Sequence, residues 1–351
     1  MNALSANPPR KSLIALSVLA SLLPTLAQSG LDPNRFQASA RLSFNVDANV
    51  GPLDFGNPNP GPPVGHGINR NYDDGYVRVD SEGNAGGLTW YWGYRDASQV
   101  PGNDTLHMNS SGVSGAGTTT LDSDGPGLGA EIAWLRDLHR TEHFSFGTKV
   151  AGSYTRFDFS SSTSQNLTLT RLTDTYDLGG IVPPGDPTKP GYQYAGIYDL
   201  PGPVIPDEPT SRETTTIPGG ASNAGSRDLT TDMWAFKLGA WVEHEFGHRF
   251  SAQLGGGFAF AVVDASLSYS ETLSWGESDL QRYSSSESHT QVVVGGYIEA
   301  ALYTRITQQL DLVFAAELMP LTSYSENLAG REVELDFGTA WSLNLGFSYR
   351  F

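Results

Sequence analysis

The chain has 351 residues and a formal net charge of −17, with 38 Asp and Glu against 21 Lys and Arg. Such an acidic chain offers little to neutralise phosphates, so nucleic-acid binding is not expected. It contains no cysteine, which excludes disulfides, thiolate metal sites and a lipid-modified cysteine at a processed N-terminus.

The first segment has the features of a secretory signal peptide. Arg10 and Lys11 form a positive region, and residues 12–26 form an apolar run. Thr25-Leu26-Ala27 supplies small residues for signal peptidase, so we expect cleavage after Ala27 and a mature chain of residues 28–351. The alternative is a short membrane anchor, but about 20 apolar residues are needed to span a bilayer and this run contains Pro24.

Beyond residue 27, apolar and polar residues alternate in several long segments, as in strands with one apolar face. The segments are residues 36–50, 88–94, 127–138, 144–159, 230–246, 250–272, 290–306, 310–325 and 333–351, with a weaker one at 72–80. Strands of globular proteins usually have about five or six residues. Membrane-spanning strands need about nine to eleven.

The connections between these segments alternate in length. Tight turns are expected near His139 and Arg140, at residues 247–249 and at 307–309. Long connections are expected at about 97–126, 160–229, 273–289 and 326–333. The longest is rich in Pro, Gly, Ser and Thr, and we expect an irregular surface loop after an initial strand extension through Leu167 and Leu169. Short turns on one side and long loops on the other are typical of membrane barrels.

The resulting fold class is all-β, a closed antiparallel up-and-down transmembrane β-barrel of about ten strands. Eight strands remain if residues 72–80 are only loop structure, and twelve are also possible. No segment after residue 27 is apolar for long enough to form a spanning helix, so a chain in lipid must pair its backbone by closing a barrel. A soluble periplasmic β-sandwich is the other architecture that could use the alternation.

The C-terminal segment carries a more specific pattern. Leu343, Leu345, Phe347, Tyr349 and Phe351 alternate up to a terminal aromatic residue. This ending resembles the assembly signal of outer-membrane β-barrel proteins of Gram-negative bacteria. The resemblance implies an outer-membrane location, insertion by the barrel-assembly machinery, and contact with outer-membrane lipid and lipopolysaccharide.

Charged residues on the polar faces of the strands are expected to line the lumen. They are Arg41, Asp47, Arg95, Glu131, Lys149, Lys237, Glu243, Glu299, Arg305, Asp311 and Glu317. Eight to ten strands leave an interior just wide enough to be filled by side chains. Because an unpaired interior charge is costly, we expect a salt-bridged plug, with a narrow polar pore as the alternative. Phe144, Phe146, Phe246, Phe250, Tyr349 and Phe351 are expected to form an aromatic girdle.

Three local motifs could carry other chemistry. His244-Glu245-Phe246-Gly247-His248 matches the zinc-protease pattern, but that chemistry needs a helix, and this segment continues a strand into a turn. Asp122-Ser123-Asp124-Gly125 resembles the opening of a calcium loop whose distal glutamate is absent. Asp73-Asp74 with Asp80 and Glu82 is expected to be a solvated acidic cluster. No metal or other cofactor is therefore predicted.

The sequence thus predicts a non-enzymatic outer-membrane barrel that has a structural role, binds ligands through its long loops or passes small solutes through a narrow pore. The alternative is an outer-membrane hydrolase acting on lipid or peptide, for which the long connection at 97–126 offers Asp104, His107 and Ser110.

Overall fold

The computed structural model describes residues 34–65, 67–79, 85–183, 193–196, 202–275 and 279–351. The predicted signal peptide lies outside these residues. Among the described residues, no helix is long and apolar enough to cross a membrane.

Eight antiparallel strands of the described chain close into a ring, which confirms the barrel. In ring order they are β1 (Asn34–Phe44), β9 (Gly127–Arg140), β10 (Phe144–Asp177), β13 (Ser211–Phe246), β14 (Phe250–Trp275), β15 (Asp279–Arg305), β16 (Leu310–Leu318) and β19 (Trp341–Arg350). The ring closes between β1 and the C-terminal strand, with Phe36 opposite Tyr349 and Phe44 opposite Trp341. The ring therefore has the eight strands of the smaller alternative and not the ten that we favoured from sequence.

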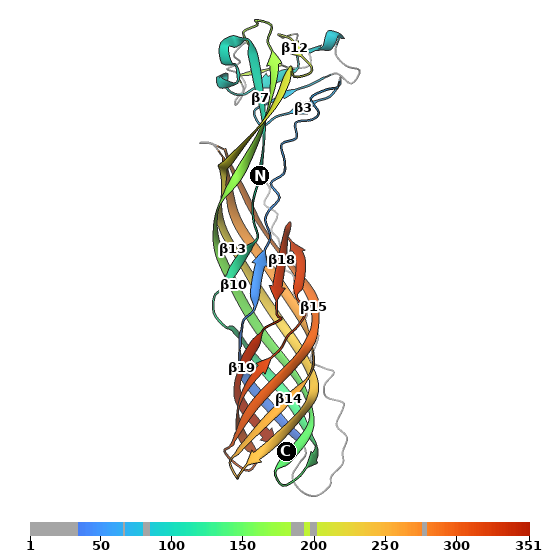
Figure 1. Cartoon of the computed structure of the whole chain (residues 1–351), viewed down its shortest axis with the longest axis vertical. Helices are drawn as coiled ribbons and strands as arrows, with labels where there is room; N and C mark the ends of the chain where they lie inside the picture. Colours follow the sequence, from blue (N-terminus) through green and yellow to red (C-terminus); the bar gives the residue numbers. More distant parts are fainter. Residues whose placement is uncertain (1–33, 66, 80–84, 184–192, 197–201, 276–278) are drawn as a thin grey trace, which may run out of the picture.

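Four of these strands continue far beyond the ring, and four further short strands complete the wall there. β10, β13, β14 and β15 have 34, 36, 26 and 27 residues. Beside them lie β8 (Thr119–Ser123), β2 (Asp47–Val50), β18 (Arg331–Asp336) and β17 (Tyr324–Leu328), paired in that order from β10. β17 returns to β15, where Thr322 donates its backbone N–H to Val294 O at 2.9 Å. We call the ring the lower section and this continuation the upper section (Figure 1).

Apolar side chains lie on opposite faces of the wall in the two sections, and β14 shows both arrangements. In the lower section its outward side chains include Phe250, Leu254, Phe258 and Phe260, all exposed. From Asp264 upward the outward residues are polar, and Val263, Ala265 and Leu267 are instead buried inside. The lower section thus has an apolar exterior, and the upper section has an apolar interior. Only the first arrangement suits contact with lipid.

The apolar belt has the height of a membrane span. β1, β16 and β19 have 11, 9 and 10 residues, which matches the nine to eleven that a tilted spanning strand needs. The expected aromatic girdle is exposed at the end of the ring that carries the tight turns: Phe144, Phe146, Phe246, Phe250, Tyr349 and Phe351. Aromatic pairs also mark the other border, where Phe44 stacks on Trp341 with ring centroids 4.4 Å apart.

Two strands that the sequence predicts as continuous are broken at the junction of the sections. Asn45 has a φ of 61°, a conformation that Asn tolerates, and it separates β1 from β2. As a result Arg41 is buried on one side of the break, whereas Val46 and Ala48, of the opposite parity, are buried on the other. The predicted strand 333–351 breaks in the same way between Phe337 and Trp341, and Asn45 Nδ2 donates to Thr339 Oγ1 across the two breaks at 2.6 Å.

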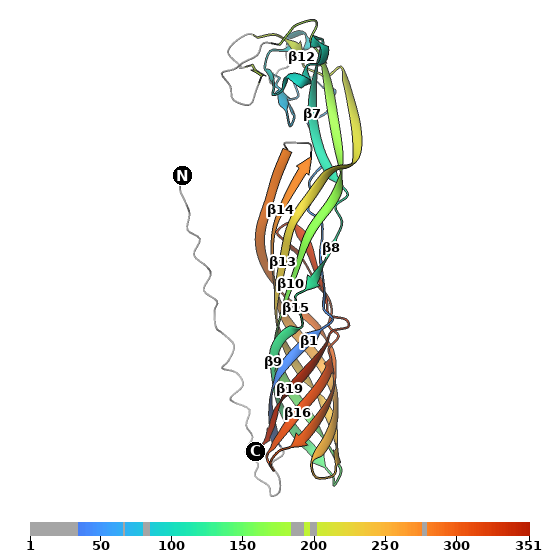
Figure 2. The same cartoon turned by 90° about the vertical axis from the view of Figure 1, so that its left-hand side faces the viewer.

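A small folded head lies above the upper section, at the end of a stalk (Figure 2). The stalk consists of β7 (Thr105–Ser114) and the ends of β10 and β13, paired side by side. The head contains β3 (Arg70–Asn71), β4 (Gly75–Val77), β5 (Leu88–Thr89), β6 (Trp92–Tyr94), β11 (Tyr194–Ala195) and β12 (Ile205–Pro206), with short 3-10 helices η1 (Ala85–Gly87), η2 (Ala97–Gln99) and η3 (Pro101–Asn103).

The head and stalk correct three predictions. Residues 72–80 and 88–94 were expected to cross the membrane, but their described parts belong to the head, around the buried side chains of Val77 and Trp92. The connection expected at 160–229 is largely strand, since β10 runs to Asp177 and β13 begins at Ser211. The connections at 97–126, 273–289 and 326–333 likewise hold strands of the stalk and the upper section.

The belt predicts different effects for the same charge at two outward positions of β14. Leu254→Arg places a cation in the lipid-facing belt and should cost about 2–4 kcal/mol of unfolding free energy. Ser268→Arg, on the same face but in the upper section, should change it by less than about 0.5 kcal/mol. Urea unfolding in lipid vesicles measures the change in unfolding free energy of both variants. Equal losses of unfolding free energy would contradict the assignment of the membrane border.

Candidate functional site: the barrel interior and the head pocket

Six charged side chains from six different strands meet in the middle of the lower section. They are Arg41, Glu131, Lys149, Lys237, Glu299 and Glu317, all buried. Arg41 Nη1 lies 2.8 Å from Glu317 and 3.3 Å from Glu131. Lys149 Nζ lies 2.7 Å from Glu299 and 3.0 Å from Glu131, and Lys237 contacts Glu131 and Glu317. We call this set the central network; its three cations balance its three carboxylates.

The strand alternation explains why these residues converge. Each occupies an inward position, and the small inward residues beside them leave room for their long side chains. Gly239 is one such residue: a Cβ at this position would lie 2.5 Å from the Tyr297 hydroxyl and 2.3 Å from the Gly256 carbonyl oxygen. Tyr297 in turn covers the Lys237 ammonium, which lies 5.4 Å from the ring centroid. The centre of the barrel is therefore filled by paired side chains.

A second set of charged side chains fills the ring at the end that carries the tight turns. Its members are Arg35, Asp137, Arg140, Glu243, Glu245, Arg305, Asp311 and Arg350. Arg35 donates to Glu243 at 2.6 Å and lies over the Trp241 ring, 4.5 Å from its centroid. Its four cations also balance its four carboxylates. We call this set the rim network.

The central network also contains the arrangement closest to a metal site. Single oxygens of Glu131, Glu299 and Glu317 lie within 4.8 Å of one another, a spacing that one cation could bridge. Each of the three carboxylates is within ion-pair distance of Lys149, Lys237 or Arg41. A metal ion would have to displace these cations, so the donor set fits a neutral ion-pair network better than a metal.

The structure places most of the predicted lumen residues inside the ring, namely Arg41, Glu131, Lys149, Lys237, Glu243, Glu299, Asp311 and Glu317. Arg305 lies at the rim and is one-third exposed. Two predictions are corrected. Asp47 points outward, because the break at Asn45 inverts the alternation, and Arg95 is exposed in the head just after β6.

Arg35 is the main lumen residue that the sequence reasoning missed. It is 2 % exposed and faces the same way as Gln37 and Arg41 in β1. Its inward position could have been found by extending the predicted segment by one residue beyond Phe36.

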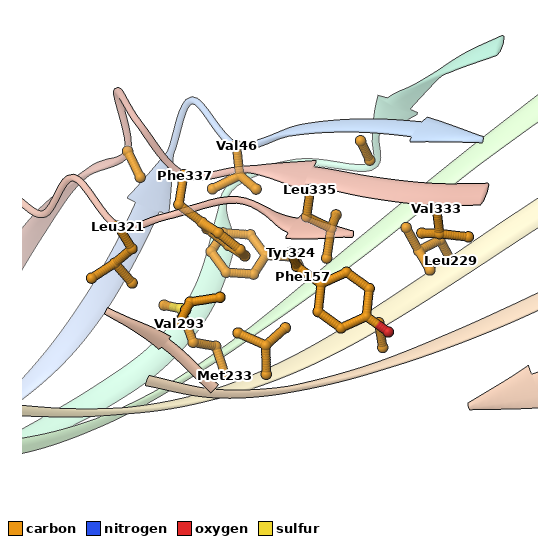
Figure 3. Packing of buried hydrophobic residues seen from close by; sticks show 14 of the residues in the cluster. Val46, Phe157, Leu229, Met233, Val293, Leu321, Tyr324, Val333, Leu335 and Phe337 are labelled. Carbon is orange, nitrogen blue, oxygen red and sulfur yellow. The ribbon is translucent and has the colours of Figure 1, made fainter. Parts of the chain in front are cut away.

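Directly above the central network, the upper section is filled by an apolar core. Phe157, Met233, Val293, Leu335 and Phe337 point toward one another from the surrounding strands (Figure 3). They belong to a larger buried cluster that runs from Val46 to Ala340. The interior is thus occupied by ion pairs at the lower level and by hydrocarbon at the upper level.

One of the links between the head and the stalk is a buried carboxylate. Asp174, at the end of β10, accepts bonds from the Tyr72 hydroxyl at 2.5 Å and from Arg212 Nε and Nη2 at 2.6 Å each. Burial, followed by the contacts with Tyr176 and Asp174, raises the pKa of Tyr72 far above its ordinary value, so the hydroxyl keeps its proton. Together with the apolar cluster that the head shares with β7 and β10, this link holds the head on the strands that rise from the barrel.

A polar pocket of about 430 Å³ lies between the head and the stalk. Its lining residues are Asp74, Asp96, Ser98, Gln99, His107, Asn109, Arg171, Thr173, Thr215 and Ile217. Asp74 is held by the backbone N–H and the side-chain amide of Asn109, at 2.8 and 2.6 Å. Burial raises the pKa of Asp74, while these hydrogen bonds oppose the rise. The size falls in the range of small-molecule sites, and all but one of the lining residues are polar.

The zinc-protease pattern has no helix to support it. His244 lies in β13 and packs on Phe144, Gly247 has a φ of 73°, and His248 is in the tight turn. The two imidazoles are therefore not on one helical face, as zinc ligation by this motif requires. Glu245 instead pairs with Arg140 at 2.5 Å.

The other motifs have structural partners. Asp124 accepts a bond from the Ser160 hydroxyl at 2.7 Å in the bend after β8, and Asp73 accepts one from the Ser111 backbone at 2.6 Å. Asp80 and Glu82 lie outside the described residues. His107 and Ser110 are three residues apart in β7, so their side chains point to opposite faces of the strand, which does not suit a nucleophile and its base.

The central network predicts a large effect for the loss of one charge. Lys237→Met leaves the buried carboxylates with an uncompensated charge and should lower the unfolding free energy by about 3–5 kcal/mol. Removing charge from both partners in Lys237→Met with Glu317→Gln should recover part of this loss. Arg156→Met, at an exposed pair outside the barrel, is the control and should cost at most about 1 kcal/mol. Tryptophan fluorescence during unfolding in vesicles measures these losses. Equal losses of unfolding free energy in Lys237→Met and the control would contradict the network.

No family model matches the chain, and no curated protein matches it. Among solved structures it is similar to the outer membrane protease OmpT from Escherichia coli, with 9% identity, 92% of this chain and 99% of that chain covered, and a TM-score of 0.34. It is also similar to the outer membrane protein OprG from Pseudomonas aeruginosa (12% identity, 92% and 98% covered, TM-score 0.31) and to the attachment invasion locus protein Ail of Yersinia pestis (8%, 90% and 99%, 0.26). With its closed ring, apolar belt and polar lower interior, this chain has the architecture of a transmembrane β-barrel.

Proposed function

We propose that the protein is a non-conducting, non-enzymatic barrel that anchors a ligand-binding head at the cell surface. The observation that carries this proposal is the filling of the interior at two successive levels, below a head that has its own pocket. A solute would have to break the ion pairs of the central network and then cross the apolar core. Neither step suits passage of a polar solute, because buried charges are costly to separate and polar solutes are costly to transfer into hydrocarbon.

The lengths of the connections support an orientation with the head outside. The tight turns at residues 141–143, 247–249 and 306–309 lie at the end of the ring away from the head. Outer-membrane barrels have short periplasmic turns and longer extracellular loops. In this orientation the polar exterior of the upper section extends into the lipopolysaccharide layer, and the head stands beyond it.

The C-terminal strand supports the proposed route of insertion. Leu345, Phe347, Tyr349 and Phe351 are exposed on the lipid-facing side of the ring, and Leu343 is half-buried on the same side. The backbone N–H of Phe351 donates to Asn34 O at 3.3 Å, at the seam with β1. We propose that the barrel-assembly machinery recognises this alternating aromatic ending during insertion.

The head pocket supports the binding role. It is lined by carboxylates, amides, hydroxyls, an imidazole and a guanidinium, so it suits a small hydrophilic ligand rather than an apolar one. The stalk supplies one wall and the head the other, so a bound ligand would also stiffen the attachment of the head.

Conductance tests the closed interior. The full-length barrel, refolded and added to a planar bilayer, should give no channel steps at moderate voltage. A parallel sample should be checked for folding by its heat-modifiable migration on a denaturing gel. Reproducible open channels from folded protein would overturn the non-conducting barrel and favour a narrow pore.

Cysteine labelling tests the orientation, and the cysteine-free chain makes it simple. Ser98→Cys, exposed in the head, should react with a membrane-impermeant maleimide on intact cells. His248→Cys, exposed in a tight turn, should react only after the outer membrane is opened. The reverse pattern would place the head in the periplasm and end the surface-display proposal.

A further inference from the structure

A third buried ionic cluster lies near the top of the upper section. Glu271, in β14, accepts bonds from Arg227 Nε, Arg331 Nη2 and Asn223 Nδ2, each at 2.6 Å. Arg331 also donates to the Gly51 carbonyl at 3.0 Å and lies over the Tyr269 ring, 4.5 Å from its centroid. We call Arg227, Arg331, Glu271 and Asn223 the upper cluster.

The upper cluster departs from the charge balance found elsewhere in the interior. The central network has three cations and three carboxylates, and the rim network has four of each. The upper cluster has two guanidinium groups and one carboxylate. Among the described buried side chains of the upper section, Glu271 is the only acid. The cluster therefore has an excess of one positive charge.

The charge states of the three groups are well defined. Burial raises the pKa of Glu271, but the hydrogen bonds from Arg227 and Asn223 and the arginine charges lower it below its ordinary value. The carboxylate is thus ionised at neutral pH. Burial lowers the pKa of Arg331, yet arginine stays protonated in proteins. The excess charge cannot be removed by moving a proton.

Apolar clusters lie below and above the excess charge. Arg227 and Arg331 are 1 % and 0 % exposed. The apolar core lies on one side, with Leu267 and Tyr269, and a second apolar cluster with Leu167, Ala221 and Leu273 lies on the other. Arg227 Nη1 and Arg331 Nε are buried donors without a partner among the described residues. A water molecule could accept these bonds but would leave the charge unbalanced, and a buried unpaired charge is strongly unfavourable.

We propose that the upper cluster binds one small monovalent anion of halide size, held by Arg227 and Arg331. The anion neutralises the excess charge and accepts the free guanidinium N–H groups. This role is structural and independent of the head pocket: the anion belongs to the folded upper section and stabilises it.

The test compares unfolding of the full chain in vesicles in sodium chloride, sodium bromide and sodium gluconate at equal ionic strength. An anion that binds only the folded state raises stability with its concentration, so the urea midpoint should rise with either halide and not with gluconate. Arg227→Gln removes the excess charge and should abolish the halide-dependent shift. Arg156→Gln, at an exposed arginine on the outer face, should retain it.

A second measurement covers the case in which Arg227→Gln does not fold. The unmodified protein should broaden the chloride NMR signal, and competing bromide should reverse the broadening. An equal midpoint in all three salts, or a halide shift that persists unchanged in folded Arg227→Gln, would overturn the proposal. The first result would mean that the cluster holds water only.

Discussion

The structure depends on the requirement that every backbone polar group in lipid be paired within the chain. The eight-strand ring meets it by joining β1 to β19 through ten consecutive residue pairs. Closure at this number fixes the width of the interior, which eight strands leave just large enough for side chains. Once the outward positions face lipid, the inward positions receive the polar residues, and the narrow interior forces their charges into contact. The pairing of the central network follows from closure.

The exchange of apolar and polar faces at one level shows how solvent sets the pattern along a single strand. Below Val262, β14 faces lipid, and its interior can be polar because the exterior already carries the apolar residues. Above it, the same strand faces water and the hydrophobic effect places Val263, Ala265 and Leu267 inside. The two sections are therefore stabilised differently, the lower by the belt in lipid and paired charges within, the upper by a core like that of a water-soluble barrel.

The sequence predicts the parts of the fold that local alternation controls. It identified the lower strands, the C-terminal pairing of Phe351's strand with that of Phe36, the tight turns and all six residues of the central network. It did not reveal the breaks at Asn45 and between Phe337 and Trp341, because the apolar residues keep the same parity across each break. They face lipid in the lower section and the interior in the upper section, so the alternation in the sequence continues without interruption. It also missed the first part of β13, whose polar residues 211–220 are mostly exposed and so lack alternation. The head pocket joins segments far apart in the chain, and no local pattern could bring His107, Arg171 and Thr215 together.

The long antiparallel pair of β10 and β13 has a mechanical consequence for any load on the head. The ladder extends from Phe144 opposite His244 to Thr175 opposite Ser211, with one irregularity near Leu167. Its hydrogen bonds lie perpendicular to the strands. Because both strands rise to the head, a force that pulls the head away from the cell acts along both of them together. It loads their hydrogen bonds to the neighbouring strands β9 and β14 in shear, many at once, instead of breaking them one by one. Tension on the head is in this way carried directly into the membrane-embedded wall.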